Sequence, residues 1–110
     1  MELHIKERIY IPQILPQQTN SFIDFNIKRE IMKKVALKES DKKEYEIEEN
    51  QEEHKIIWNA QKDAEMPLVV EFTNDEIGFL KKACESLPNT AYPDDFWMVV
   101  EKIYDEALNQ

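Results

Sequence analysis

Glycine is the residue that this sequence has least of, since Gly78 is the only glycine among 110 residues. Loops that cradle phosphates or dinucleotides need several glycines, because their backbone must reach positive φ or approach the ligand closely. Two-residue Asn-Gly and Asp-Gly hairpins are excluded for the same reason. The scarcity of glycine therefore argues against nucleotide-binding enzymes and favours helices joined by proline and polar turns.

Cysteine and long apolar runs are scarce as well. The single cysteine, Cys84, cannot form an intramolecular disulfide, which agrees with a reducing compartment. No apolar run approaches the roughly 20 residues needed to cross a bilayer. The first eight residues have neither the apolar stretch nor the cleavage site of a secretory signal. We therefore expect a cytoplasmic chain that has no membrane partner.

The net charge of −9 arises from 23 acidic and 14 basic residues that are unevenly distributed. The acidic excess lies after residue 38, and a basic cluster precedes it. This cluster consists of Lys28, Arg29, Lys33 and Lys34. A net negative chain is repelled by phosphates, and the cluster lacks interleaved aromatic residues, so no direct binding of nucleic acid is expected. The acidic excess is either an ordinary solvated surface or a surface for a basic partner.

Three helices are predicted from capping residues followed by apolar periodicity. Ser21 with Asp24 opens a helix over 21–37, whose apolar face consists of Ile23, Ile27, Ile31 and Val35. Thr73 with Glu76 opens a second helix, whose seam consists of Ile77, Leu80, Cys84 and Leu87. Pro93 opens the last helix, whose broad apolar face consists of Phe96, Val100, Ile103 and Ala107.

Period-two alternation at 45–48 and 55–58 predicts two antiparallel strands joined by an acidic loop over about 48–54. The β-branched and aromatic segment 68–72 predicts a third strand. Segment 7–15, restricted by its prolines, is either a short helix or a bent extended piece. Together these elements predict an α+β fold. We expect a single compact domain, residues 1–110, in which helices at both ends of the chain pack on a small, mainly antiparallel sheet of about three strands.

No group of residues has the spacing of a catalytic, cofactor or metal site, so an enzyme is not expected and no cofactor is predicted. Cys84 falls in an apolar seam, which predicts a packed thiol rather than a nucleophile. His54 follows several glutamates that could gather a divalent cation, but no established ligand spacing supports such a site. Asp94 and Asp95 are adjacent, about 100° apart on a helix, and are assigned to capping.

Gly78 has two interpretations, because it falls inside the helix that Thr73 opens. The favoured one is close packing against a neighbouring element of the fold, and the other is close approach of a ligand or partner backbone. Trp58 and Trp97 are candidate interaction residues, because aromatic anchors dominate the energetics of interfaces. Trp97 lies one position off the apolar stripe of its helix and is the stronger of the two candidates.

Three short segments resemble a pattern found in small uncharacterised proteins of bacterial, prophage and mobile-element gene clusters. They are Ile14-Leu15-Pro16, Ile57-Trp58-Asn59 and the stretch Val70–Glu76 that opens a helix. The resemblance implies a cytoplasmic accessory protein, and it brings no catalytic residue with it.

Three functions are weighed from these observations. The first is a non-enzymatic protein-interaction module that uses the apolar residues of the last helix and acidic edges, with a homo-oligomer as one form of it. The second is an acidic mimic of nucleic acid that occupies a DNA-binding protein. Its contact residues would be Glu48, Glu49, Glu52 and Glu53. The third is a small metal-dependent enzyme built around His54.

Overall fold

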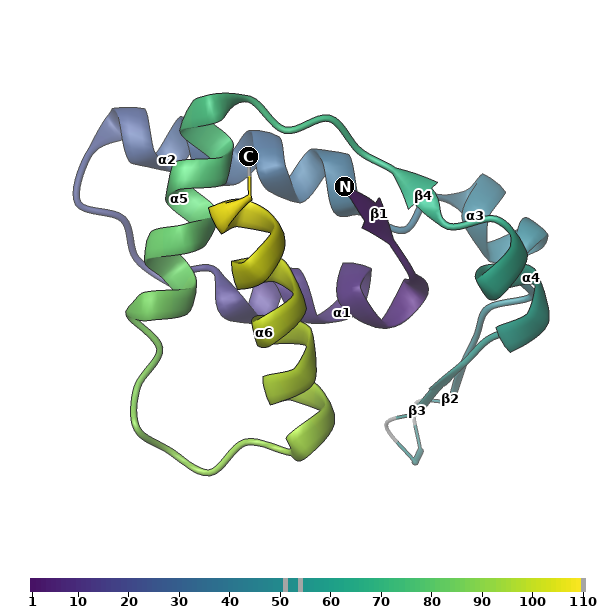
Figure 1. Ribbon diagram of the computed structural model, residues 1–110. Helices are drawn as coiled ribbons and strands as arrows, with labels where there is room; N and C mark the ends of the chain where they lie inside the picture. The colour runs from purple at the N-terminus through teal and green to yellow at the C-terminus, as the bar shows by residue number, and fades with distance from the viewer. Residues whose placement is uncertain (51, 54, 110) are drawn as a thin grey trace.

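The structure of this chain is a computed structural model that describes residues 1–50, 52–53 and 55–109. The described residues form six helices and four short strands (Figure 1). The helices are α1 (Ile5–Ile14), α2 (Phe22–Val35), α3 (Glu39–Glu44), α4 (Ala60–Glu65), α5 (Asn74–Glu85) and α6 (Asp94–Leu108). The strands are β1 (Glu2–Leu3), β2 (Glu48–Asn50), β3 (Lys55–Ile57) and β4 (Leu68–Val69). This is the α+β class that the sequence predicts.

The strands form two separate antiparallel pairs, which differs from the single sheet of about three strands expected above. One pair is the hairpin of β2 and β3, in which Glu49 lies opposite Ile56. In the other pair β4 lies beside β1, with Leu3 opposite Leu68. The backbone of Met1 extends this second pair through hydrogen bonds with Val70 in both directions, each 2.9 Å long. The N-terminal residues thus pair with β4, where the hairpin strands were expected to join the same sheet.

The two helices with predicted side-chain caps, α2 and α5, begin where the sequence indicates. The Ser21 hydroxyl accepts the backbone N–H of Asp24 at 3.1 Å, so α2 begins at Phe22. At α5 the Thr73 hydroxyl accepts the N–H of Glu76 at 3.1 Å, and the Glu76 carboxylate accepts the N–H of Thr73 at 2.8 Å. This reciprocal capping box satisfies donors that have no partner within the helix.

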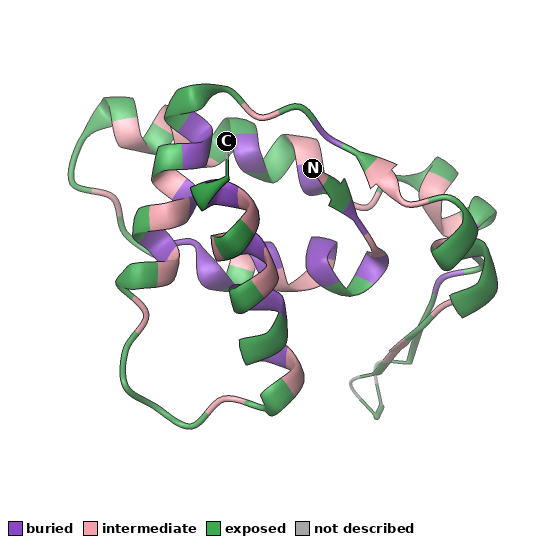
Figure 2. Ribbon diagram, in the orientation of Figure 1, coloured by how far each residue is buried: buried purple, intermediate pink, exposed green. Residues whose placement is uncertain are grey.

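Helices α1, α2, α5 and α6 pack around the main core, with α5 in contact with both α2 and α6 (Figures 1 and 2). The predicted apolar face of α6 is buried: Phe96, Val100 and Ile103 belong to this core, and Ala107 is buried as well. A smaller cluster joins the start of α1 to the hairpin. Its buried members are Ile5, Tyr45 and Ile47. The main core therefore rests on helix packing, and the hairpin is attached to it through α1.

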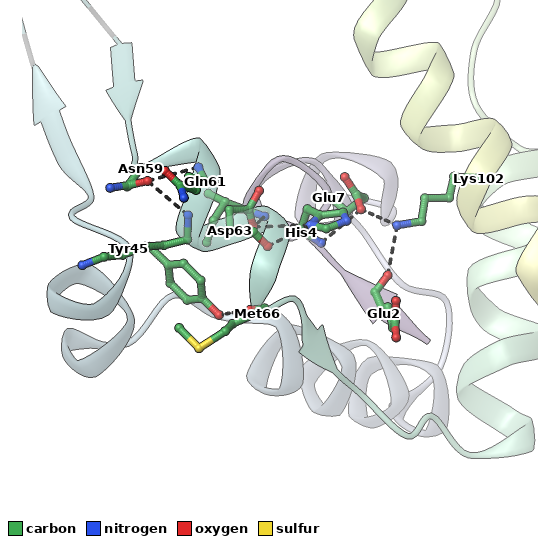
Figure 3. A network of polar contacts seen from close by, with 11 residues as sticks. Glu2, His4, Glu7, Tyr45, Asn59, Gln61, Asp63, Met66 and Lys102 are labelled. Atoms are coloured by element: carbon green, nitrogen blue, oxygen red, sulfur yellow. Dashed lines mark hydrogen bonds and ion pairs between the residues drawn. The ribbon is translucent and has the colours of Figure 1, made fainter.

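A polar network ties the N-terminal residues to α4 and α6 (Figure 3). The amino group of Lys102 on α6 donates to the Glu7 carboxylate and, at 3.0 Å, to the Glu2 carbonyl. The Glu7 carboxylate also accepts the N–H of His4 at 3.1 Å, which caps α1. The carboxylate of Asp63 on α4 accepts the N–H of Ile5 at 2.9 Å.

Two further carboxylates are paired in the same manner, Asp41 with Arg8 at 2.9 Å and Glu76 with Lys34 at 2.5 Å. Burial acts to raise the pKa of Glu7, Asp41 and Glu76, but hydrogen bonds from the paired cation and from backbone N–H groups outweigh it. The pKa of each carboxyl is therefore lowered from its ordinary value. All three groups favour the ionised form in the folded state.

We expect acid to destabilise the fold through these carboxyls. A carboxyl whose pKa is lower in the folded state stabilises the fold above its unfolded pKa, and this stabilisation is lost as the pH falls through the folded value. The free energy of unfolding should stay level down to about pH 5 and decrease below the ordinary values of 4.5 for Glu and 3.8 for Asp. Urea titrations between pH 7 and pH 3 measure this, with Glu76→Gln expected to show a smaller decrease than the natural chain. An unfolding free energy that stays constant to pH 3 would contradict it.

Candidate protein-interaction groove

The described surface contains an open groove of about 620 Å³. It lies between the C-terminal end of α1, the first half of α2, one side of α5 and the segment that follows α5. Its walls are mainly apolar, with side chains from all of these parts of the chain. Among them are Ile14, Ile27, Phe79, Leu87 and Tyr92. A concave, mostly apolar surface with a few polar groups at its rim is the usual form of a binding site.

Gly78 lies in this groove, and the predicted close packing at Gly78 is wrong. Apart from its two chain neighbours and the local helix backbone, no atom lies within 4 Å of where a Cβ on Gly78 would stand. The residue is exposed and its φ is not positive, so neither packing nor backbone geometry requires a glycine. A glycine inside a helix costs about 0.5–1 kcal/mol relative to alanine. The space above Gly78 belongs to the groove, and the other interpretation, close approach of a ligand or partner backbone, stays a prediction.

The apolar face of α2 is covered along only half of its length. Ile31 and Val35 are fully buried in the main core, as the sequence predicts. Ile27 lines the groove, and Ile23, one turn earlier, is 72% exposed. Phe22 beside it is 75% exposed. The seam of α2 therefore continues from the core through the groove to an uncovered apolar end.

Three charged side chains line the groove. Asp24 in the first turn of α2 and Asp75 in the first turn of α5 both line it, and Lys82 lines it farther along α5. Lys82 follows Asp75 by seven residues, which corresponds to roughly 10 Å along a helix axis. Within the part of the chain that the structure describes, none of the three side chains is in an ion pair.

Trp97 lies beside the groove rather than in it. The ring of Trp97 contacts Tyr92 edge-on at 5.2 Å between centroids, and Tyr92 both stacks on Phe96 at 4.4 Å and lines the groove. Trp97 is 37% exposed, at the edge of the buried face of α6. Most of that face packs in the core. The large apolar residues that α6 still exposes are Trp97, Met98 and Leu108.

Trp58 takes part in a different surface. It packs on the smaller cluster and lines a second hollow of about 350 Å³ between α1, β3 and the start of α6. In that hollow the hydroxyl of Tyr10 donates to Asp95 at 2.9 Å, and Lys6 lies 3.7 Å from the same carboxylate. The hydrogen bond from Tyr10 lowers the pKa of Asp95. The two tryptophans therefore lie in different settings, and their role in binding stays a prediction.

The acidic residues of the hairpin are exposed, as a solvated surface would be. Glu48 and Glu49 are neighbours on β2, so their side chains point to opposite faces of the strand. Glu53 lies 3.7 Å from the amino group of Lys55. The N–H groups of Glu52 and Glu53 both point at the side-chain oxygen of Asn50, at 3.1 and 3.3 Å. Of the four carboxylates that the nucleic-acid mimic would use, Glu53 therefore has a cationic partner, and Glu48 and Glu49 point to different faces.

The metal-site hypothesis depends on His54, which lies outside the described residues. Across residues 1–50, 52–53 and 55–109, no three His, Cys, Asp or Glu side chains gather as a metal site would need.

Cys84 is a packed thiol in this structure, with its Sγ 4.0 Å from the Val100 carbonyl oxygen. Burial, assisted by the nearby charge of Glu85, raises the pKa of the Cys84 thiol to about 11. Because the thiolate is the reactive form, we expect iodoacetamide at pH 8 to modify Cys84 about a hundredfold more slowly in the folded chain than in urea. Mass spectrometry of timed samples measures both rates. Equal rates in the two states would contradict the packed setting.

No family of known proteins matches this chain, and searches of curated proteins and of solved structures found no significant match. None of the helices within the described residues has the length and apolar character needed to cross a membrane.

Apart from Gly78, the residues of the groove were not predicted from the sequence as binding residues. Ile14 and Leu15 lie near the end of an element that the sequence left ambiguous, and Phe79 and Tyr92 resemble ordinary core residues there. The signal that pointed to the groove is Gly78, a glycine inside a well-capped helix. Only the packing of α1, α2 and α5 shows that the space above it is open.

Proposed function

We propose that this chain is a non-enzymatic protein-interaction module, an accessory protein of the kind that the resemblance to small bacterial and prophage proteins implies. The observation that carries the proposal is the apolar groove between α1, α2 and α5, with a glycine in its lining and an uncovered apolar end at Phe22 and Ile23. Burial of apolar surface is the main source of free energy in protein association. The groove supplies such surface in concave form.

Charge supports a protein rather than a nucleic acid as the partner. The net charge of −9 opposes binding to phosphates. In the basic cluster of α2, Lys33 pairs with Glu30 at 3.5 Å and Lys34 pairs with Glu76. Arg29 donates to the side chain of Asn26 and lies over the ring of Phe25. Much of the basic cluster is thus engaged within the chain.

Site-specific photo-crosslinking in a lysate of the source cell tests this function. A photoreactive phenylalanine analogue is placed at Gln17 or Ser86, two exposed residues that line the groove, and at Glu101 on α6 as a control. We expect a defined protein adduct from the groove positions and not from position 101. Equal adducts from all positions, or none from the groove, would contradict the proposal. So would a turnover activity that a single side-chain substitution abolishes.

A further inference from the structure

Within the proposed interaction function, on which this step rests, we infer that the groove binds one amphipathic helix of a partner protein. That helix crosses α5 at Gly78, and it carries Lys or Arg beside Asp24 and Asp75. Three independent features of the groove support this choice of partner: the open space above the glycine, the half-covered apolar seam of α2, and the set of charges that line the groove.

The first feature is the position of Gly78. An exposed helical glycine without a neighbour inside the fold allows another backbone to approach α5 closely. Helices in contact usually lie 8–10 Å apart, and small residues at the contact give the short end of that range. The apolar residues Phe79 and Ala83 follow the glycine along α5 in the same groove. A helix that crosses here covers apolar surface next to its closest point.

The second feature is the seam of α2. Helix-in-groove recognition uses apolar side chains at i, i+3, i+4 and i+7 that fill an apolar channel. The groove lining includes Ile27 on α2 and Leu87 after α5, and the exposed Ile23 continues the α2 side. A helix lying along this channel would cover the part of the α2 seam that the core leaves open.

The third feature is the set of charges that line the groove. Asp24 lies in the first turn of α2, Asp75 lies in the first turn of α5, and Lys82 lies two turns along α5 from Asp75. The matching helix has basic residues where it passes the two aspartates and an acidic residue near Lys82. Such a partner is also drawn toward the chain as a whole, because the net charge is −9.

A second copy of this chain fits the groove less well than a basic helix does. Each copy carries a net charge of −9, so association of two copies brings like charges together. The chain's own basic cluster on α2 is largely engaged with Glu30, Asn26 and Glu76. A partner with basic residues available on a helix has neither disadvantage.

Selection from a displayed peptide library tests the inference on the full chain. The peptides are amphipathic helices of about 16 residues, roughly 24 Å long, with apolar residues on one face. Lys and Glu are equally represented at both ends, and the central position is Gly, Ala, Ser or Leu. We expect selected peptides to carry Lys at one end, Glu at the other and a small residue at the centre.

Variants of the chain then locate the bound peptide. Binding of the best peptide, measured by fluorescence anisotropy, should weaken by at least about tenfold for Gly78→Leu. The same variant should melt no lower than the natural chain, because leucine favours the helix and its Cβ meets no atom within 4 Å apart from its two chain neighbours and the local helix backbone. The double variant D24N/D75N should weaken binding by about tenfold and reduce its salt dependence. The matched double variant E101Q/D105N on α6 should leave the affinity within about twofold.

Several results would overturn the inference. One is a library that yields no binding peptide. Another is a selected peptide that binds the Gly78→Leu variant as tightly as the natural chain. A third is a set of selected peptides in which neither end is enriched in basic residues. Sedimentation that shows a dimer, dissociated by Gly78→Leu, would assign the groove to a second copy instead. The proposed function fails separately: if Gln17 and Ser86 still crosslink a lysate protein while no helical peptide binds, the interaction function stands and the helix is wrong. If neither experiment detects a partner, both proposals fall.

Discussion

Replacing Arg8 by methionine is expected to lower the free energy of unfolding by about 3–5 kcal/mol. The Arg8 side chain is only 2% exposed and lies where α1, the end of α2 and the start of α3 meet. Its Nε donates to the Val35 carbonyl at 3.1 Å, and its Nη2 donates to the Ala36 carbonyl at 2.7 Å and to Asp41 at 2.9 Å. Methionine keeps an unbranched apolar stem but is shorter than arginine and removes every one of these donors.

The size of the effect follows from what is left behind. Val35 and Ala36 close α2, and carbonyls at a helix C-terminus have no partner within the helix. The C-terminus is the negative end of the helix dipole, and it therefore also favours a cation. Asp41 would keep its hydrogen bond to the Lys38 N–H, 2.8 Å long, but would lose its cation. Removing one partner of a buried pair leaves the other desolvated and unpaired, which is the costly case.

Two controls make the Arg8 experiment decisive. Arg29→Met makes the same chemical change at an exposed position of α2 and should alter stability by less than about 0.5 kcal/mol. In an Asp41→Asn background the cost of Arg8→Met should be smaller, and the difference isolates the ion pair from the carbonyl bonds. Urea unfolding followed by circular dichroism supplies all of these values. A cost below about 1 kcal/mol for Arg8→Met would show that water replaces the guanidinium without penalty.

Local chemistry explains which elements the sequence predicted well. Caps at Ser21 and Thr73 involve residues three positions apart, so their geometry is contained in the sequence itself. The buried face of α6 was likewise predictable, because helical periodicity places Phe96 and Ile103 on one side. The start of α4 also carried a local signal, since the Asn59 side chain accepts the N–H groups of Gln61 and Lys62, but the element was not predicted.

Pairing between distant segments explains what the sequence could not predict. The strand at Leu68–Val69 was expected, but its partner is the two-residue strand Glu2–Leu3, which is too short to show any periodicity. The ambiguity over residues 7–15 was resolved as helix, with Pro12 inside α1. Contacts with α2 and α6 support that helix, and such contacts override weak local preference.

The candidate site was the least predictable part of the molecule. Trp58 and Trp97 were chosen by residue type, yet neither lines the larger groove. The groove exists because α1, α2 and α5 meet without filling the space over Gly78. A cap or a periodic seam can be seen in one helix alone, whereas a gap between three helices depends on how all of them pack. The glycine carried a signal, and its favoured interpretation was wrong because that packing was unknown.

Replacing Phe96 by alanine is expected to cost about 3–5 kcal/mol of unfolding free energy. Phe96 is 1% exposed and contacts three aromatic rings: Tyr92 at 4.4 Å, Tyr10 at 5.5 Å and Trp97 at 5.8 Å. Alanine would remove these contacts and leave a cavity that three separate elements border. The same substitution at the exposed Phe22 should cost less than about 0.5 kcal/mol. Chemical unfolding followed by circular dichroism avoids the direct effect of Phe96 on Trp97 fluorescence.

Phe96→Leu separates the loss of stability from the effect on the groove. Leucine fills most of the space, so its cost should stay below about 1.5 kcal/mol and the chain should remain folded. Tyr92, however, loses its stacked partner, and Tyr92 is part of the groove wall. We therefore expect Phe96→Leu to weaken binding of the selected helical peptide by a few-fold under conditions where the chain is fully folded. Unchanged peptide affinity for Phe96→Leu would mean that the groove wall at Tyr92 is held by the backbone alone. If Phe96→Ala lowered the free energy of unfolding by no more than Phe22→Ala does, Phe96 would not organise the core.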